Sequence, residues 1–208
     1  DDVFRLLVGG SRTAPARQQT LRATLDWSYL LLNSVEQQRF ERLAVFAGGF
    51  DLDGVDAIWS EDVEEARPDT LDTLTGLVDR SLVTVQRQAD GMRYRMLEPV
   101  QQYAKERLIK RGVWEATRKQ HAAYFLRLTQ QAEEGLKGAD AEVWESRLDL
   151  EHDNLRAVLR RCLDAGEPEI PLRICTALRN FWQQYGYRNE GLEEALRVES
   201  DVPPTVRA

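Results

Sequence analysis

The sequence predicts a mainly α-helical protein, in which a winged-helix domain with a small β-hairpin precedes an antiparallel, tetratricopeptide-like helical array. Apolar residues recur at helical spacing along most of the 208 residues. Around residues 82–97 the pattern changes to the alternation of a hairpin, and from Gly112 onward glycines and prolines separate long helical stretches. We therefore expect a linker within residues 1–18, a winged helix over 19–110 and the helical array over 111–208.

Four helices are expected before the hairpin. The first begins near Thr20. Ser34, with Gln37 three residues on, has the pattern of a capping box and predicts the start of the second. Asp51 is expected to cap the third, because a carboxylate can accept hydrogen bonds from the free N–H groups of a first turn. The fourth helix is expected to run from Asp69.

The hairpin is predicted from two alternating segments, around Leu82–Val85 and Met92–Leu97, joined by a turn at Ala89-Asp90-Gly91. Within it, one face is expected to carry Met92, Tyr94 and Met96, and the other face Arg93 and Arg95. Pro99 suits the first turn of the next helix, where no backbone N–H is needed. Three helices followed by a two-stranded hairpin form the winged-helix order.

Beyond Gly112, helices are expected over about 114–134, 140–164 and 170–185, with another after Gly191. Their lengths and short breaks predict antiparallel pairs, as in α-solenoids. No strict 34-residue period is present, so the tetratricopeptide comparison is approximate.

Composition and motifs argue against an enzyme site or a metal site in these residues. There is no phosphate-binding G-x-x-x-x-G-K-[ST] loop. The two histidines are His121 and His152, and Glu151-His152-Asp153 offers adjacent ligand types, but neighbouring helix residues point in different directions, so a solvated or capping cluster is expected there. The two cysteines, Cys162 and Cys175, predict no disulfide framework, which favours a cytoplasmic protein. The sequence has no run of about 18 apolar residues, so no membrane-spanning helix is predicted.

DNA binding is the obvious function of a winged helix, but the charges are unfavourable. The net charge is −7, and the expected recognition helix over 69–79 carries three aspartates and no basic residue before Arg80. The basic residues of this region lie in the hairpin: Arg87, Arg93 and Arg95. We therefore favour a packing module over a DNA reader and keep direct DNA binding as the alternative. A hydrolase or metal site is a further rival.

Several blocks of the chain resemble bacterial STAND-type signalling ATPases, relatives of the NB-ARC switch ATPases that occur in LuxR-type and antibiotic-regulator-type transcription factors. The similar blocks are residues 18–29, 43–50, 77–83, 94–104, 121–125 and 151–157. In that family a P-loop ATPase module and a small helical subdomain come first, so residues 1–18 would include the tail of that subdomain.

The resemblance implies a regulatory, non-enzymatic fragment that couples nucleotide state to a helical sensor array. ATP or ADP would bind the upstream ATPase module of the longer protein, not this fragment. In such proteins the winged helix folds back on the nucleotide site, and the array senses a protein or a small-molecule signal. DNA would then be contacted through other domains.

One motif of the family falls on Met96-Leu97-Glu98. NB-ARC relatives have Met-His-Asp at this place, and their histidine approaches the nucleotide phosphate. Here Leu97 replaces the histidine and cannot donate a hydrogen bond, while Glu98 keeps the acid. The resemblance therefore implies a nucleotide-sensing position facing the ATPase module. The alternative is that Met96 and Leu97 pack the hairpin on the core and Glu98 caps the following helix.

Overall fold

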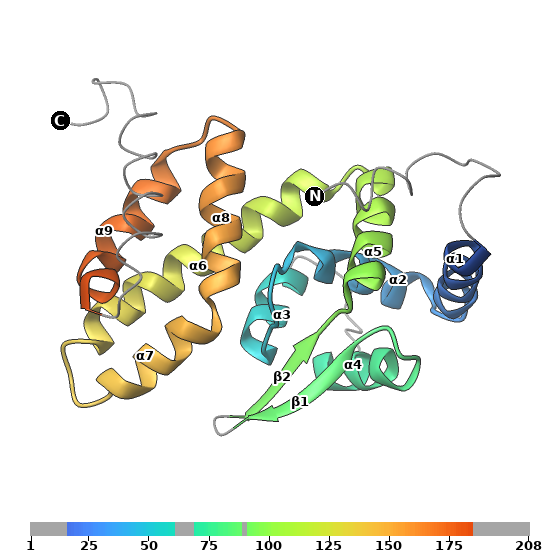
Figure 1. The fold of residues 1–208 in the computed structure, drawn as a ribbon, viewed down its shortest axis with the longest axis horizontal. Helices are drawn as coiled ribbons and strands as arrows, with labels where there is room; N and C mark the ends of the chain where they lie inside the picture. Colours follow the sequence, from blue (N-terminus) through green and yellow to red (C-terminus); the bar gives the residue numbers. More distant parts are fainter. Residues whose placement is uncertain (1–15, 61–68, 89–90, 185–208) are drawn as a thin grey trace.

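The computed structural model describes residues 16–60, 69–88 and 91–184, and within them it confirms the mainly α-helical class with one small antiparallel sheet (Figure 1). In chain order the elements are α1 (Ala16–Leu30), α2 (Ser34–Arg42), the 3-10 turn η1 (Leu43–Val45), α3 (Leu52–Trp59), α4 (Thr70–Asp79), β1 (Thr84–Gln88), β2 (Gly91–Arg95), α5 (Glu98–Arg111), α6 (Trp114–Gly135), α7 (Ala141–Leu150), α8 (His152–Asp164) and α9 (Glu169–Gln184). Most of the linker, part of the hairpin turn and the helix expected after Gly191 lie outside the described residues.

The caps of the first helices agree with the sequence except at α2. Asp51 accepts a hydrogen bond from the Gly54 N–H at 2.8 Å, as expected, and Asp69, just before α4, accepts one from the Leu71 N–H. The capping box of α2 lies one residue earlier than Ser34. It is formed by Asn33 and Glu36, because the side chain of each accepts from the backbone of the other.

The hairpin lies between α4 and α5 and is joined by a short third segment. β1 pairs with β2 in antiparallel register, with Val85 opposite Tyr94. On the other edge of β2, Phe50 exchanges two backbone hydrogen bonds with Tyr94, at 2.9 and 2.8 Å. The segment between η1 and α3 is thereby tied to the hairpin, and the helix, helix, helix, hairpin order is present.

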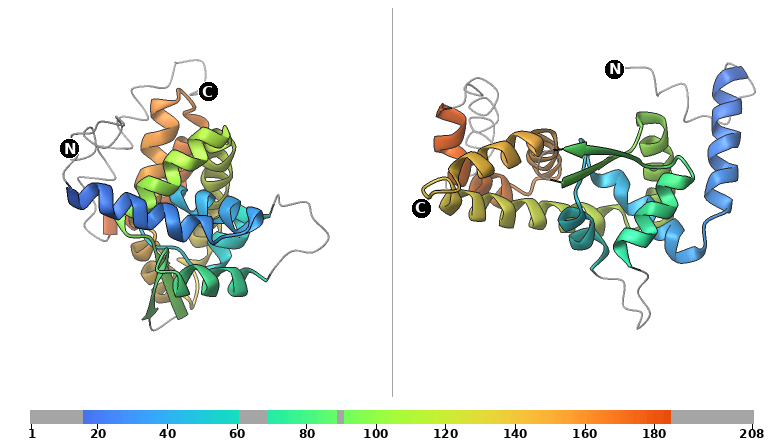
Figure 2. Two further views of the ribbon diagram at one scale, coloured as in Figure 1. Left: turned by 90° about the vertical axis from the view of Figure 1, so that its right-hand side faces the viewer. Right: turned by 90° about the horizontal axis from the view of Figure 1, so that it is seen from below.

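The remaining helices pack around α6. It starts beside α5, packs against α3 and α8, and also contacts α7 and α9 (Figures 1 and 2). The helix expected over 140–164 is two helices, since the chain leaves helical geometry at Glu151 (φ −94°, ψ 3°). No helix within the described residues is long and apolar enough to cross a membrane.

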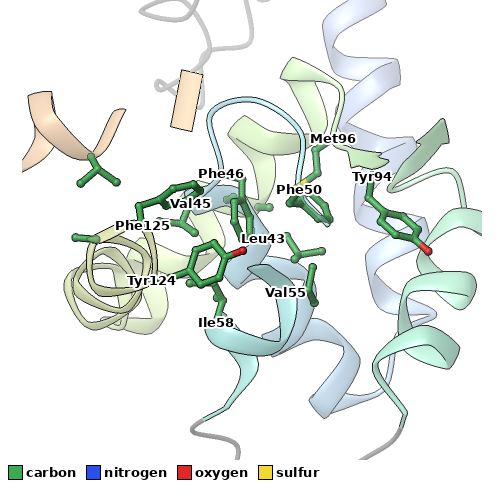
Figure 3. Packing of buried hydrophobic residues seen from close by; sticks show 14 of the residues in the cluster. Leu43, Val45, Phe46, Phe50, Val55, Ile58, Tyr94, Met96, Tyr124 and Phe125 are labelled. Atoms are coloured by element: carbon green, nitrogen blue, oxygen red, sulfur yellow. The ribbon is translucent and has the colours of Figure 1, made fainter. Parts of the chain in front are cut away.

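One buried core runs from the hairpin region into the helical region. Figure 3 shows Tyr124 and Phe125 of α6 beside Val45, Phe46 and Ile58 of the first region. All of these side chains are buried, so the two regions share one continuous apolar core and do not meet through hydrated surfaces.

Trp27 is exposed, unlike the other described aromatic residues of the first region, which are buried. It lies on α1 with 65% of its surface exposed, while Tyr29 on the same helix is buried and donates to Glu41. In Figure 2, α1 lies at one end of the described structure, so only one of its faces packs against other helices. Trp27 is on the opposite, exposed side of α1.

Candidate functional site

Arg93 joins β2 to the helical region through a buried network of hydrogen bonds and an ion pair. Its guanidinium forms a buried ion pair with both carboxylate oxygens of Glu151 and also donates to the carbonyls of Gly49 and Leu150, at 2.8 and 2.9 Å. The two charged side chains are 10% and 3% exposed. A planar guanidinium suits this arrangement because its donors fork toward several acceptors at once.

Asn154 completes the same junction from α8. Its amide nitrogen donates to the Glu151 carboxylate at 2.7 Å and to the Gly49 carbonyl at 2.8 Å, and its oxygen accepts from Ala47. The break between α7 and α8 places Glu151 and Asn154 side by side at the start of α8. The charge of Glu151 is thus neutralised and hydrogen-bonded, which a buried carboxylate requires.

Gly49 allows Arg93 to approach the backbone. A Cβ at position 49 would lie 2.6 Å from the Arg93 Nε, closer than real Cβ atoms come to such a neighbour, and 3.0 Å from the Tyr94 carbonyl oxygen, which is a tight contact. Gly49 therefore leaves room for the junction.

Sequence reasoning missed this junction. The alternation placed Arg93 on the outer face of the hairpin with Arg95, whereas Arg93 is buried and Met92 is exposed. Likewise Glu151, expected in a solvated or capping cluster, is buried. The signal that was available is the Gly-Gly pair close to an arginine-bearing hairpin, but it does not identify the partner of that arginine.

The face of α4 that is open to solvent is acidic. Asp69, Asp72 and Asp79 are exposed there, together with Leu71 and Thr75. The nearby basic side chains are engaged: Arg39 is buried, donates to Thr73 and covers the Trp59 ring, and Arg80 donates to the Gly76 carbonyl. In the hairpin, Arg87 and Arg95 are exposed and Arg93 is not.

The predicted nucleotide-sensing residues are split between core and surface. Met96 is buried in the core, whereas Leu97 is 56% exposed and Glu98 is also exposed. Leu97 is the N-cap residue of α5 and makes no side-chain cap hydrogen bond, and Pro99 lies in the first turn as expected. The packing alternative thus holds for Met96 but is wrong for Leu97, and Glu98 is not the N-cap. Leu97 and Glu98 thus both lie on the surface.

His121 of α6 is enclosed between the two regions. Its ring meets Phe46 edge-on at 5.1 Å and lies 4.7 Å from Phe125, and its Nε2 is buried without a hydrogen-bond partner. Burial, and then the positive charge of Arg161, lower the pKa of His121 to about 3. The imidazole is therefore neutral at physiological pH and acts as a packing ring.

The comparisons with known proteins agree with this geometry. Residues 32–109 match the family described as a winged helix-turn-helix domain. They form a winged helix-turn-helix domain. The match spans α2 to α5, the elements that carry Arg93 and the acidic α4 face.

Relatives are found in mycobacteria. "Putative HTH-type transcriptional regulator Rv0890c" of Mycobacterium tuberculosis is 39% identical over 193 residues, which is 92% of this chain and 21% of the relative. A Mycobacterium bovis protein, "Putative HTH-type transcriptional regulator Mb0914c", gives the same figures. "Uncharacterized protein Rv0894" of M. tuberculosis is 43% identical over 112 residues, 54% of this chain and 28% of the relative. The chain thus spans about a fifth of the length of the first two relatives. No solved structure gives a significant match.

Replacing Arg93 with alanine should strongly destabilise the chain. The Glu151 carboxylate would then be buried without its cation, which typically lowers the free energy of unfolding by ~3–5 kcal/mol. Arg95→Ala is the matched control: it removes an exposed arginine two residues along the same strand, and surface changes stay within about 0.5 kcal/mol. Urea unfolding measures both. Equal losses for the two variants would contradict a structural ion pair at Arg93.

The stability of the chain should depend on His121 between pH 7 and 5.5. The unfolded chain binds a proton on this imidazole below about pH 6.5, whereas the folded chain does not until about pH 3. Acid therefore favours the unfolded state, and the free energy of unfolding should fall by about 1 kcal/mol from pH 7 to 5.5. In His121→Leu this part of the decrease should disappear. An unchanged pH slope in that variant would show that His121 is protonated in the fold.

Proposed function

We propose that the chain is a non-enzymatic part of a transcription regulator and that its winged helix contacts DNA through the hairpin. The observation that carries this proposal is the winged helix-turn-helix match over residues 32–109, on a fold with the corresponding order of elements. The names of the mycobacterial relatives add support. These findings favour DNA contact over the ATP switch, because they describe helix-turn-helix regulators and do not refer to a nucleotide.

The charges determine how such a contact would be made. In the usual docking, the second helix of the helix-turn-helix enters the major groove, but the exposed face of α4 carries Asp69, Asp72 and Asp79, which phosphates repel. The exposed arginines of the hairpin, Arg87 and Arg95, would supply the phosphate contacts. We therefore propose a weak, phosphate-dominated contact with little reading of base edges.

A duplex titration at low salt tests this proposal. At about 50 mM salt the chain should bind a short duplex, and two phosphate contacts predict a slope of log K against log salt of about −1.8. Arg87→Ala with Arg95→Ala should abolish binding, whereas Arg127→Ala, an exposed arginine of α6, should leave it unchanged. Absence of binding by the unaltered chain at this salt concentration would exclude the hairpin as a DNA contact.

A second function is supported by the same acidic face and by the exposed start of α5. Here the winged helix is a docking module of an ATP-switched regulator, as the resemblance to STAND ATPases implies. An upstream ATPase module of the longer protein would hold ADP or ATP, Leu97 and Glu98 would face it, and the helices from α6 onward would receive a protein or small-molecule signal. The division into residues 19–110 and 111–208 belongs to this proposal.

The switch is tested in the longer protein by Glu98→Ala. If the Glu98 carboxylate accepts a hydrogen bond from the ADP-bound module, its loss should raise basal transcriptional activity and leave the melting temperature nearly unchanged. Glu142→Ala, an exposed glutamate in the first turn of α7, is the control for helix-end charge. Unchanged basal activity with a lowered melting temperature would remove Glu98 from the switch.

A further inference from the structure

Three elements bring basic side chains together around Trp114, the first residue of α6. The Lys105 ammonium of α5 lies 4.8 Å from the centre of the Trp114 ring, and the Arg161 guanidinium of α8 lies 5.4 Å from it. Arg160, the residue before Arg161, is exposed. Two cations thus share one aromatic ring, which attracts positive charge through its electron-rich face.

Within the described parts of the chain, no carboxylate pairs with these cations. Five other partly or fully buried arginines do have acidic partners: Arg93 has Glu151, Arg107 has Asp26, Arg111 has Glu41, Arg118 has Glu115 and Glu167, and Arg147 has Asp51 and Asp53. The cations around Trp114 differ from these five in having no acidic partner within the described residues.

The environment of the cluster disfavours its positive charges. Burial, and then Arg160 and Arg118, lower the pKa of Arg161 to about 10. Burial, together with Arg161 and Arg160, also lowers the pKa of Lys105. The three cations repel one another across a partly desolvated space, so an anion entering it would gain more than at an ordinary surface arginine.

The fold holds Arg161 in place for such a role. Its Nη1 donates to the Val45 carbonyl at 2.6 Å, which fixes the guanidinium at the contact between α8 and η1. Lys105 makes no hydrogen bond or ion pair within the described residues, so its three ammonium donors are available. A fixed guanidinium fork beside a free ammonium is a combination that recognises the oxygens of a phosphate group.

We propose that Lys105, Arg160 and Arg161 around Trp114 form a binding site for the phosphate group of a small ligand. A doubly charged phosphate would neutralise the repulsion that a single carboxylate would leave in part. The site lies where α5 and α8 each bring a cation to the start of α6.

Thermal unfolding of the 208-residue chain in inorganic phosphate tests the site. At about 20 mM phosphate the melting temperature should rise by about 3 °C above that in sodium chloride of equal ionic strength, as expected for millimolar affinity. Lys105→Gln combined with Arg160→Gln should reduce the rise to less than about 1 °C. Each variant is compared with itself in chloride, so a change in its own stability does not enter the result.

Lys110→Gln is the matched control, because Lys110 is an exposed lysine of the same helix outside the cluster. It should keep the full rise. A parallel series in ADP separates the sources of phosphate: a larger rise assigns the phosphate to a nucleotide, an equal rise to the phosphate group alone, and both support the site. An equal melting temperature of the unaltered chain in phosphate and chloride overturns the proposal. So does an equal loss in Lys110→Gln, or a duplex that binds through Lys105 and Arg160 when phosphate does not.

Discussion

The buried ion pair between Arg93 and Glu151 is the constraint on which the arrangement of the two regions depends. Arg93 comes from the middle of β2, and Glu151 comes from the break between two helices of the other region. Neither charge would be tolerated in this interior without the other. The glycine at position 49, the break at 151 and the amide of Asn154 are all used to satisfy this pair. The ring of Phe46 also packs against His121, and His121 packs against Phe125, so aromatic contacts add to the paired polar groups of the junction.

This constraint affects both proposed functions. Because Arg93 anchors the hairpin to Glu151 at the start of α8, the remaining hairpin arginines, Arg87 and Arg95, have a fixed direction. Any DNA contact would therefore be made by the winged helix and the helical region as one rigid body. The same rigidity suits a docking module. If a partner displaced the exposed start of α5, then α6 and α8 would move with it, because within the described residues no flexible linker separates them. The phosphate site proposed at Trp114 lies on the same contact between α5, α6 and α8.

Much of the fold could be predicted from the sequence because its signals are local. The apolar period, the capping carboxylate of Asp51 and the proline at 99 each act within one turn of chain, and the structure confirms them. The site could not be predicted in the same way. Arg93 and Glu151 are 58 residues apart, and the alternation of a hairpin indicates two faces without saying which of them another region will cover. The break at Glu151 was missed because no glycine or proline marks it in the sequence.

The most direct test of a single body held by Arg93 and Glu151 is hydrogen exchange of the unaltered chain across a urea series. Amides of α4 report on the winged helix, and amides of α8 report on the helical region. If the junction couples them, the most protected amides of both helices should lose protection at the same urea concentration and with the same opening free energy. Protection that persists in α8 at urea concentrations where α4 is fully exchanged would contradict the account.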